Sequence, residues 1–390
     1  MVVPQIPHMG RDDPTPRLDE RAARNLRLDP RAGILALPML PRDFPAGGYT
    51  SDYVGFWVIW LVLAAAAFLF VRAARGTSGR MRLLLGNALV FGAILWTVVL
   101  AAETYLRYVY DRSDSYGLTL TNWSWFGRHV NFNGGGFRDV EWGAEKRPGT
   151  ERIACVGDSF TMGWGVPEAN DAFPQRIGSA LQARSPGRFE VRNYGVAGYT
   201  TGHELDLIEQ AVPAAQFDRV ILGYCLNDPD DLLPPDRWFD RDKAPRVPFI
   251  EPTRSFVADF LWFRLVLADD PHIRDYYAYG REAYEDPEIW ARQCERFRRI
   301  AMRCRAASVR LVVVVFPLLH DWGPNYRFDG CHDRVVEAWQ KLGVQVIDLR
   351  EAYRGIPGSE LVANRLDAHP NARAHEIAAR TILDRVFGVR

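Results

Sequence analysis

Four short polar stretches, far apart in the chain, carry the residue types that acyl-transfer chemistry needs. A GDSF stretch offers the hydroxyl of Ser159, and a DAHPN stretch near the C-terminus offers the imidazole of His369. A serine becomes a useful nucleophile only beside a base, and the tetrahedral oxyanion formed by its attack needs donors aimed at it. The backbone at Gly198 in NYGVAG and the side-chain amide of Asn227 in CLND are candidate donors.

A doubly wound parallel α/β sheet would bring these stretches together. From Arg152 onward the chain alternates apolar runs with amphipathic segments, which is typical of that fold class. Ligands bind at the carboxyl ends of parallel strands, so residues just after the strands meet at one edge. Strands are expected near 152–157, 189–194, 219–225, 309–316 and 344–349, and helices near 172–184, 202–213, 287–307, 331–342 and 371–387.

The corner that carries Ser159 is expected to be a strand, a tight turn and a helix. Gly157 is expected to adopt a backbone angle that a β-carbon would forbid, and Asp158 to bond nearby backbone N–H groups. By itself the tripeptide is equally typical of an ordinary polar turn. The three other stretches favour a functional corner.

The sequence resembles the SGNH hydrolases, also called GDSL-type esterases. The resemblance covers about residues 131–388 and rests on GDSF, NYGVAG, CLND and DAHPN in the family's order. It implies a flavodoxin-like five-stranded sheet and attack by Ser159, with His369 shuttling the proton. It also implies an oxyanion hole made by the backbone N–H groups of Ser159 and Gly198 and the Asn227 amide. The GFRD segment at 136–139 resembles what precedes the domain in many extracytoplasmic members.

One position departs from the family pattern. The usual D-x-x-H spacing would place the acid at Leu366, whereas the acid here is Asp367, two residues before His369. Asp367 can still orient the ring if the loop bends, which gives a triad. If it points away, a backbone carbonyl orients the ring and a Ser/His dyad remains. Replacing Asp367 with alanine would then lower turnover far less than replacing Ser159.

Further polar residues are weighed for contact with substrate. Asp158 and Asp228 are candidates because they adjoin the nucleophile and the amide donor. His203 opens a helix after the Gly198 loop, where a capping or surface role is favoured over substrate contact. His320 follows the fourth strand and is a candidate for substrate contact. His375 is expected to be structural, and His272 and His332 give no signal.

Composition narrows the remaining classes of function. The 390 residues have a formal net charge of zero, with 48% hydrophobic and 25% charged residues, and no basic stripe accompanies them. No nucleic-acid partner is therefore expected. The chain has no phosphate-binding loop, dinucleotide fingerprint or metal-ligand spacing, so neither a cofactor nor a metal is expected. Cys155 and Cys225 are expected to be buried, and Cys304 and Cys331 could pair only in an oxidising compartment.

Two apolar segments, 54–71 and 83–102, contain no charged residue and are each long enough to cross a bilayer. A buried core helix is the alternative. The link between them, 72–82, carries four arginines and no acid, which by the positive-inside rule makes it cytoplasmic. We therefore expect a multi-pass protein of the cell membrane whose catalytic domain is extracytoplasmic. The preceding tail, 1–53, is expected to be disordered and has no recognisable signal peptide, and Met39 is an alternative start.

Two further segments carry open alternatives. Residues 103–150 are either a flexible linker or a segment packed beside the active site. Within the hydrolase domain, 151–390, a long insertion spans 229–286 and contains an amphipathic piece at 256–267. An insertion of this length is usually functional, as a lid, a recognition surface or a patch resting on the membrane.

The leading function is that of a membrane-tethered serine esterase acting on acyl esters of a cell-surface glycan or lipid, with O-acetyl groups the first candidate. The alternative is an O-acyltransferase that passes the acyl group from Ser159 to an exopolysaccharide. Whether the acceptor pocket excludes water decides between them. A catalytically silent glycan-binding component is the third hypothesis, because a fold does not imply a function.

Overall fold

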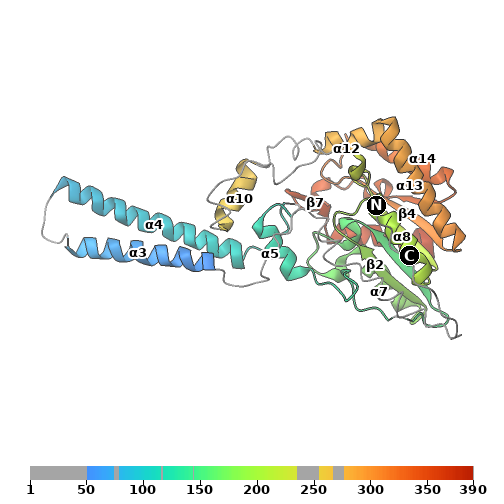
Figure 1. Cartoon of the computed structure of the whole chain (residues 1–390), viewed down its shortest axis with the longest axis horizontal. Helices are drawn as coiled ribbons and strands as arrows, with labels where there is room; N and C mark the ends of the chain where they lie inside the picture. The colour runs from blue at the N-terminus through green and yellow to red at the C-terminus, as the bar shows by residue number, and fades with distance from the viewer. Residues whose placement is uncertain are drawn as a thin grey trace, which may run out of the picture.

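The computed structural model describes residues 51–73, 79–115, 117–143, 145–234, 254–266 and 276–389. The tail at 1–50, His272 and much of the insertion lie outside these ranges. Two parts are visible in Figure 1: a long pair of helices and an α/β domain that carries the C-terminal half of the chain.

The domain is built on a parallel sheet of five strands in the order β2-β1-β3-β4-β5. The strands are β1 (Glu151–Gly157), β2 (Phe189–Gly195), β3 (Arg219–Cys225), β4 (Arg310–Phe316) and β5 (Gln345–Asp348). This is the flavodoxin-like doubly wound sheet that the sequence predicts, and each strand lies within two residues of its expected bounds. The chain reverses its direction across the sheet at β1 and β3, and this switch point is where such sheets open a crevice for ligands.

Helices cover both faces of the sheet. Crossovers between parallel strands are right-handed, so the reversal after β2 puts α7 (Phe173–Arg184) on the face opposite to α8 (Thr201–Ala214). The helix α16 (Ala372–Phe387) packs on α7, and α13 (Pro287–Ala306) packs on α8 and beside α14 (Asp329–Lys341). All five predicted helices are confirmed. Their apolar faces close the core, where Phe297 stacks on Trp339 with ring centroids 4.4 Å apart.

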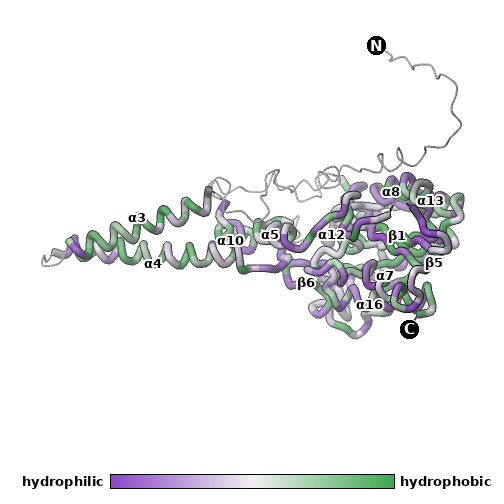
Figure 2. The backbone as a smooth tube through the Cα atoms, turned by 90° about the horizontal axis from the view of Figure 1, so that it is seen from below, coloured by the Kyte–Doolittle hydropathy of each residue, from purple (hydrophilic) through white to green (hydrophobic). Residues whose placement is uncertain are grey.

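Two long apolar helices precede the domain: α3 (Ser51–Ala73) and α4 (Arg80–Tyr108). They pack against each other, and most of their side chains are exposed in the structure. Both are long and apolar enough to cross a membrane, judged by length and composition alone. Figure 2 shows them projecting from the domain as a predominantly hydrophobic hairpin. Ser51 to Tyr53, expected to belong to the tail, begin α3 instead.

A short helix from the insertion packs on the last turns of α4. This helix, α10 (Phe256–Leu265), begins at the fully buried carboxylate of Glu103. That carboxylate accepts hydrogen bonds from the N–H groups of Phe256 at 2.9 Å and Val257 at 3.0 Å. A negative charge at a helix N-terminus stabilises the helix. The predicted amphipathic piece is therefore a helix, and it is bound to the end of α4.

The remaining short elements frame the site and the insertion. They are α5 (Leu120–His129), α6 (Ser159–Met162), α12 (Tyr276–Glu285), α15 (Arg350–Tyr353) and the 3-10 turns η1 (Ala169–Asp171), η2 (Asp230–Leu232) and η5 (Gly358–Glu360). An antiparallel hairpin of β6 (Val362–Asn364) and β7 (Asp367–Pro370) leads into α16. The sequence analysis did not predict this hairpin.

Candidate active site

Ser159 is the first residue of α6, directly after β1. Asp158 caps this helix, and its carboxylate accepts the N–H of Phe160 at 2.8 Å, as the sequence predicts. The Ser159 side chain is thereby held at the carboxyl edge of the sheet beside the switch point. Its residue surface is 8% exposed, so the hydroxyl is sheltered but reachable.

The reason for the glycine at 157 differs from the expected one. Gly157 is not among the glycines with a positive φ angle. A β-carbon at Gly157 would lie 2.1 Å from Oγ1 of Thr161 and 2.7 Å from the carbonyl oxygen of Gly223. The glycine is needed because α6 packs very closely on the sheet, and no strained backbone angle is involved.

His369 and Asp367 come from one strand, β7. His369 Nε2 lies 2.8 Å from Ser159 Oγ, and His369 Nδ1 lies 2.6 Å from Asp367 Oδ1. Alternate residues of a strand point to the same side, so a carboxylate two residues before the histidine lies on the same side as the ring. This is the arrangement that the triad alternative requires, and the dyad alternative loses its premise that Asp367 points away.

The Asp367 carboxylate is completely buried yet ionised. Burial alone would raise its pKa, but the neighbouring His369 charge and the hydrogen bonds from His369 and Ser113 outweigh burial and hold the pKa below its usual value. A buried carboxylate stays charged only when it is paired and hydrogen-bonded. Asp367 is thus suited to orient an imidazole and to stabilise its protonated form.

Candidate donors for an oxyanion lie on the two neighbouring loops. Gly198, in the turn after β2, has φ +80°, which is accessible to glycine at little cost. Among the described residues, the N–H groups of Ser159 and Gly198 have no protein acceptor. Asn227 follows β3 and is half-buried, and its amide acts to lower the pKa of Asp158. These groups come from three loops at one edge of the sheet.

Comparison with known families settles the class of the enzyme. Residues 155–377, more than half of the chain, match the model of the GDSL-like Lipase/Acylhydrolase family. The chain belongs to this family. As a GDSL-like acylhydrolase it is an ester hydrolase, in agreement with the chemistry that the four sequence blocks predict.

Solved structures with a similar fold share little sequence identity with this chain. A catalytic mutant of Axe2, an acetylxylan esterase from Geobacillus stearothermophilus, is 17% identical over 62% of this chain and 96% of that chain, with a TM-score of 0.40. TesA is 12% identical over 60% and 96% of the two chains, with a TM-score of 0.39. The psychrotrophic esterase EstA from Pseudoalteromonas sp. is 12% identical over 61% and 97%, with a TM-score of 0.38. No curated protein matches the sequence.

Two acids expected as substrate contacts are instead buried beneath the site of this GDSL-like enzyme. Asp158 and Asp228 are both 0% exposed, and neither side-chain oxygen of Asp228 has a hydrogen-bond partner in the described part of the chain. Burial raises the pKa of Asp158 to about 6 and that of Asp228 well above its usual range. Glu204 on α8, which the sequence analysis did not single out, is equally buried. Burial and the nearby charge of Asp158 raise its pKa, and its own charge adds to the effect of burial on the pKa of Asp228.

Two of the weighed histidines have structural roles, and one is a candidate for contact with substrate. His203 is exposed and completes a capping box at the start of α8, with its Nδ1 3.0 Å from Oγ1 of Thr200, so its capping role is confirmed. His375 is buried and structural, because its Nδ1 accepts the N–H of Phe173 at 3.3 Å. His320 lies at the rim, where partial desolvation lowers its pKa and where it senses the charges of Asp367 and His369. It remains a candidate for substrate contact.

The lead-in segment packs beside the active site and is not a free linker. Arg138 of the GFRD motif is buried and donates to the carbonyl oxygens of Gly163, Val166 at 2.8 Å and Pro167 at 2.9 Å. These carbonyls belong to the loop that follows α6. Because the guanidinium is buried there, its pKa falls to about 10. Arg138 of GFRD therefore holds the loop next to Ser159 in place.

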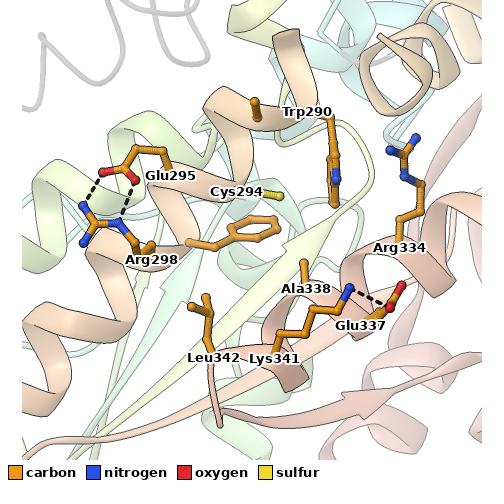
Figure 3. Close-up of a pocket in the computed structure, with 11 residues that line it drawn as sticks. Trp290, Cys294, Glu295, Arg298, Arg334, Glu337, Ala338, Lys341 and Leu342 are labelled. Atoms are coloured by element: carbon orange, nitrogen blue, oxygen red, sulfur yellow. Dashed lines mark hydrogen bonds and ion pairs between the residues drawn. The ribbon is translucent and has the colours of Figure 1, made fainter. Parts of the chain in front are cut away.

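All five cysteines are free, so Cys304 and Cys331 do not form a bridge. Within the described ranges, no group of three or more His, Cys, Asp or Glu side chains is arranged to hold a metal. A separate groove of about 610 Å³ lies between α13 and α14 (Figure 3), and none of the site residues above lines it. Its rim carries ion pairs of Glu295 with Arg298 and of Glu337 with Lys341.

Proposed function

We propose that this protein is a membrane-tethered serine esterase that removes acyl groups from a cell-surface glycan or lipid. The observation that carries the proposal is the continuous contact from Ser159 through His369 to Asp367, with spacings of 2.8 Å and 2.6 Å. Nucleophile, base and orienting acid within hydrogen-bond reach are the requirement for serine acyl chemistry.

The reaction proceeds in two halves. Ser159 Oγ bonds to the ester carbonyl carbon while its proton passes to His369 Nε2. The imidazolium then gives this proton to the leaving alcohol as the carbon–oxygen bond breaks, which leaves an acyl-enzyme. Water then attacks the acyl carbon while its proton passes to His369. His369 returns this proton to Ser159 Oγ as the bond between the acyl carbon and Oγ breaks, which releases the carboxylic acid and free Ser159.

Charge develops on the carbonyl oxygen in both halves. The backbone N–H groups of Ser159 and Gly198 and the amide of Asn227 are placed to receive it. Such preorganised donors supply a large share of catalysis, because losing one typically costs about 10²–10³-fold in kcat. Asp367 keeps the His369 ring aimed at Ser159 and balances the positive charge that the ring acquires.

The tether is formed by residues 54–102, the lead-in by 103–150 and the catalytic domain by 151–390. The two apolar helices cross the membrane, and the arginine-rich link, which includes Arg72, Arg80 and Arg82, stays in the cytoplasm. The hydrolase domain then faces the outside, where acylated glycans and lipids of the envelope are its substrates. O-acetyl esters are the first class to test.

The test is ester hydrolysis by the full-length protein in detergent. Initial rates on p-nitrophenyl esters from acetate to dodecanoate are compared for wild type, Ser159→Ala and Ser359→Ala. Ser359 is an exposed serine on η5 and serves as the matched control. We expect steady turnover and fluorophosphonate labelling that only Ser159→Ala abolishes, with the highest kcat/KM on the shortest chains.

Other outcomes contradict parts of the proposal. A preference for long chains would replace the acetyl ester with a lipid substrate. A burst near one equivalent that stalls until an oligosaccharide is added would replace the hydrolase with an acyltransferase. Activity that survives in Ser159→Ala would overturn the assignment of the nucleophile.

A further inference from the structure

The segment that follows α4 reaches the acid of the active site. Ser113 lies shortly after the end of α4 and is buried, and its hydroxyl donates to Asp367 Oδ2. The same hydroxyl oxygen accepts the indole N–H of Trp164 at 3.0 Å. The two oxygens of Asp367 are thus shared between two partners, because Oδ1 faces His369 and Oδ2 faces Ser113.

The single proton of Ser113 is committed to the carboxylate. Its other acceptor within reach is Asn122 Oδ1, at 3.5 Å. A hydroxyl has one hydrogen to donate, and a hydrogen bond to an ionised group is about twice as strong as one between neutral groups. The closer and charged Asp367 therefore takes it.

Ser113 also holds the hairpin that carries Asp367 and His369. Its backbone carbonyl accepts the side-chain amide of Asn364, on β6. The oxygen of that amide accepts the N–H of Leu366 at 2.9 Å, in the turn between β6 and β7. Both the backbone and the side chain of Ser113 thus fix the position of β7.

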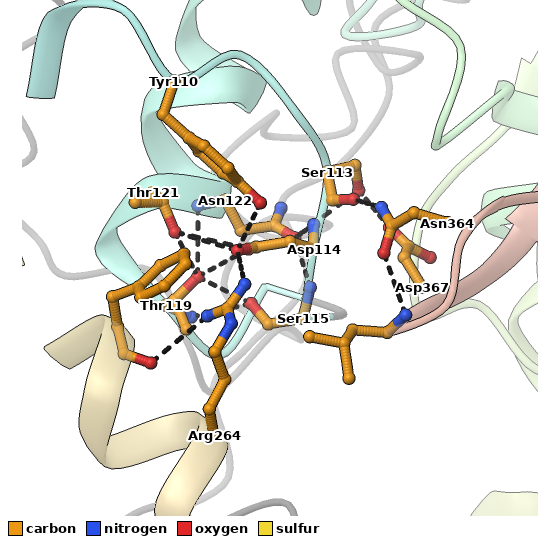
Figure 4. Close-up of polar contacts among 12 residues, drawn as sticks. Tyr110, Ser113, Asp114, Ser115, Thr119, Thr121, Asn122, Arg264, Asn364 and Asp367 are labelled. Carbon is orange, nitrogen blue, oxygen red and sulfur yellow. Dashed lines mark hydrogen bonds and ion pairs between the residues drawn. The ribbon is translucent and has the colours of Figure 1, made fainter. Parts of the chain in front are cut away.

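The loop around Ser113 is itself closed by polar contacts, drawn in Figure 4. Asn122 Oδ1 accepts the N–H groups of Asp114 at 3.0 Å and Ser115 at 3.1 Å. The buried Asp114 carboxylate accepts from Thr119 at 2.9 Å and from Arg264 of α10 at 2.7 Å. The loop therefore joins the end of α4, the insertion helix and the catalytic hairpin.

We propose that Ser113, in the segment that follows α4, is a positioning residue for Asp367. Its hydroxyl keeps the Asp367 carboxylate ionised and aimed at the ring of His369. The inference rests on the proposed function, since it assigns a role relative to the Ser159, His369 and Asp367 relay. Without Ser113, the Oδ2 atom of a completely buried carboxylate would lose its hydroxyl donor. Of the two contacts by which Ser113 holds β7, only the one from its backbone carbonyl through Asn364 would remain.

Removing the hydroxyl should change both rate and pH dependence. A hydrogen bond to a charged group contributes about 1.5–3 kcal/mol, which corresponds to about tenfold to hundredfold in kcat. The carboxylate freed of its donor attracts the imidazolium proton more strongly, so the acid limb of the kcat/KM profile moves to higher pH. Among the described residues, the titratable groups that sense the charge of His369 are Asp367, Asp158, His320 and His375, and none of them is changed by the substitution.

The test uses the full-length protein with Ser113→Ala, Ser113→Thr and Ser115→Ala. Ser115 is the matched control, because it is buried in the same loop but its hydroxyl bonds Thr119 at 2.8 Å. Rates are divided by the concentration of fluorophosphonate-reactive sites, so that misfolded protein does not count. We expect Ser113→Ala to lose about tenfold or more in kcat with little change in KM and a raised acid limb. Ser113→Thr should keep most of the rate, and Ser115→Ala should leave the limb in place.

Three results would overturn the inference. If Ser113→Ala has the same kcat per active site as the wild type, the hydroxyl has no role in catalysis. A lower rate with an unmoved acid limb, or the same limb shift in Ser115→Ala, would reduce Ser113 to a structural residue of the loop. In all three cases Ser159-dependent activity of the wild type would leave the proposed function intact. If the wild type shows no such activity on any ester, the proposed function fails first and this inference with it.

Discussion

Replacing Asp367 with asparagine tests the relay most directly. The change keeps the shape of the side chain and removes its charge. In the wild type, Asp367 Oδ1 lies 2.6 Å from His369 Nδ1, and the carboxylate is completely buried. In the proposed mechanism, the imidazolium formed during attack by Ser159 is therefore stabilised by a negative charge in direct contact.

The size of the effect follows from Coulomb's law. Two unit charges whose centres are about 4 Å apart interact by about 4 kcal/mol at an effective dielectric constant of about 20. Each 1.36 kcal/mol of barrier is about tenfold in rate, so the charge term alone predicts a loss of about 10³-fold in kcat. An amide can also hold the wrong tautomer of the ring, and the same change in serine-protease triads costs about 10⁴-fold. We expect a loss between these two values.

The assay is ester hydrolysis per fluorophosphonate-titrated site, measured from pH 5 to 9. Removing the negative charge makes the imidazolium less favourable, so the acid limb should move to lower pH, opposite to the shift expected for Ser113→Ala. A loss of less than tenfold, with a normal titre of active sites, would refute the triad reasoning. The enzyme would then work as a Ser159/His369 dyad.

Two further predictions concern the buried acids and the tether. In the native state, burial raises the pKa of Glu204 and Asp228 well above their usual values. Once the pH exceeds the usual carboxyl pKa of about 4, the native state thus retains protons that the unfolded state releases, and stability falls as pH rises. Glu204→Gln should raise Tm at pH 8 and flatten this decline in differential scanning fluorimetry. Exposed Asp206→Asn on the same helix is the control, and an unchanged slope in Glu204→Gln would contradict the reasoning. For the tether, a reporter enzyme that works only outside the cytoplasm should be active when fused after residue 390 and inactive when fused within the 72–82 link, and the reverse pattern would invert the topology.

The fold was accessible from the sequence because its signals are local. The apolar runs that form β1 and β3 stand out along the chain, and short polar stretches follow them. A parallel sheet then brings those stretches to one edge without further information. Ser159 and Asn227 could be placed in this way, and Gly198 could be placed after the strand predicted at 189–194.

Contacts between distant segments explain what the sequence analysis missed or misread. Gly157 has the sequence context of a turn glycine, yet it is required because a β-carbon there would also lie 2.7 Å from the carbonyl oxygen of Gly223, on the neighbouring strand β3. Asp228 reads as a polar residue at a functional edge, but the chain turns it beneath that edge. Ser113 belongs to no recognisable sequence motif, and its hydrogen-bond partner Asp367 is far away in the sequence. Only the tertiary packing shows that the two residues meet.

The helix α4 continues past its apolar stretch, and this extension sets how far the hydrolase domain stands from the membrane in the proposed topology. The helix has 29 residues, which at about 1.5 Å per residue makes it about 43 Å long. A hydrocarbon layer takes up about 30 Å of that length. In the proposed topology the remainder forms a rigid post, and the Glu103 contact with α10 braces its top against the insertion. In that topology the proposed nucleophile, Ser159, is held at a set distance above the lipid surface, and the enzyme reaches only ester groups within a thin layer of the envelope. Ester groups deeper or further out must come to it by the motion of their own chains.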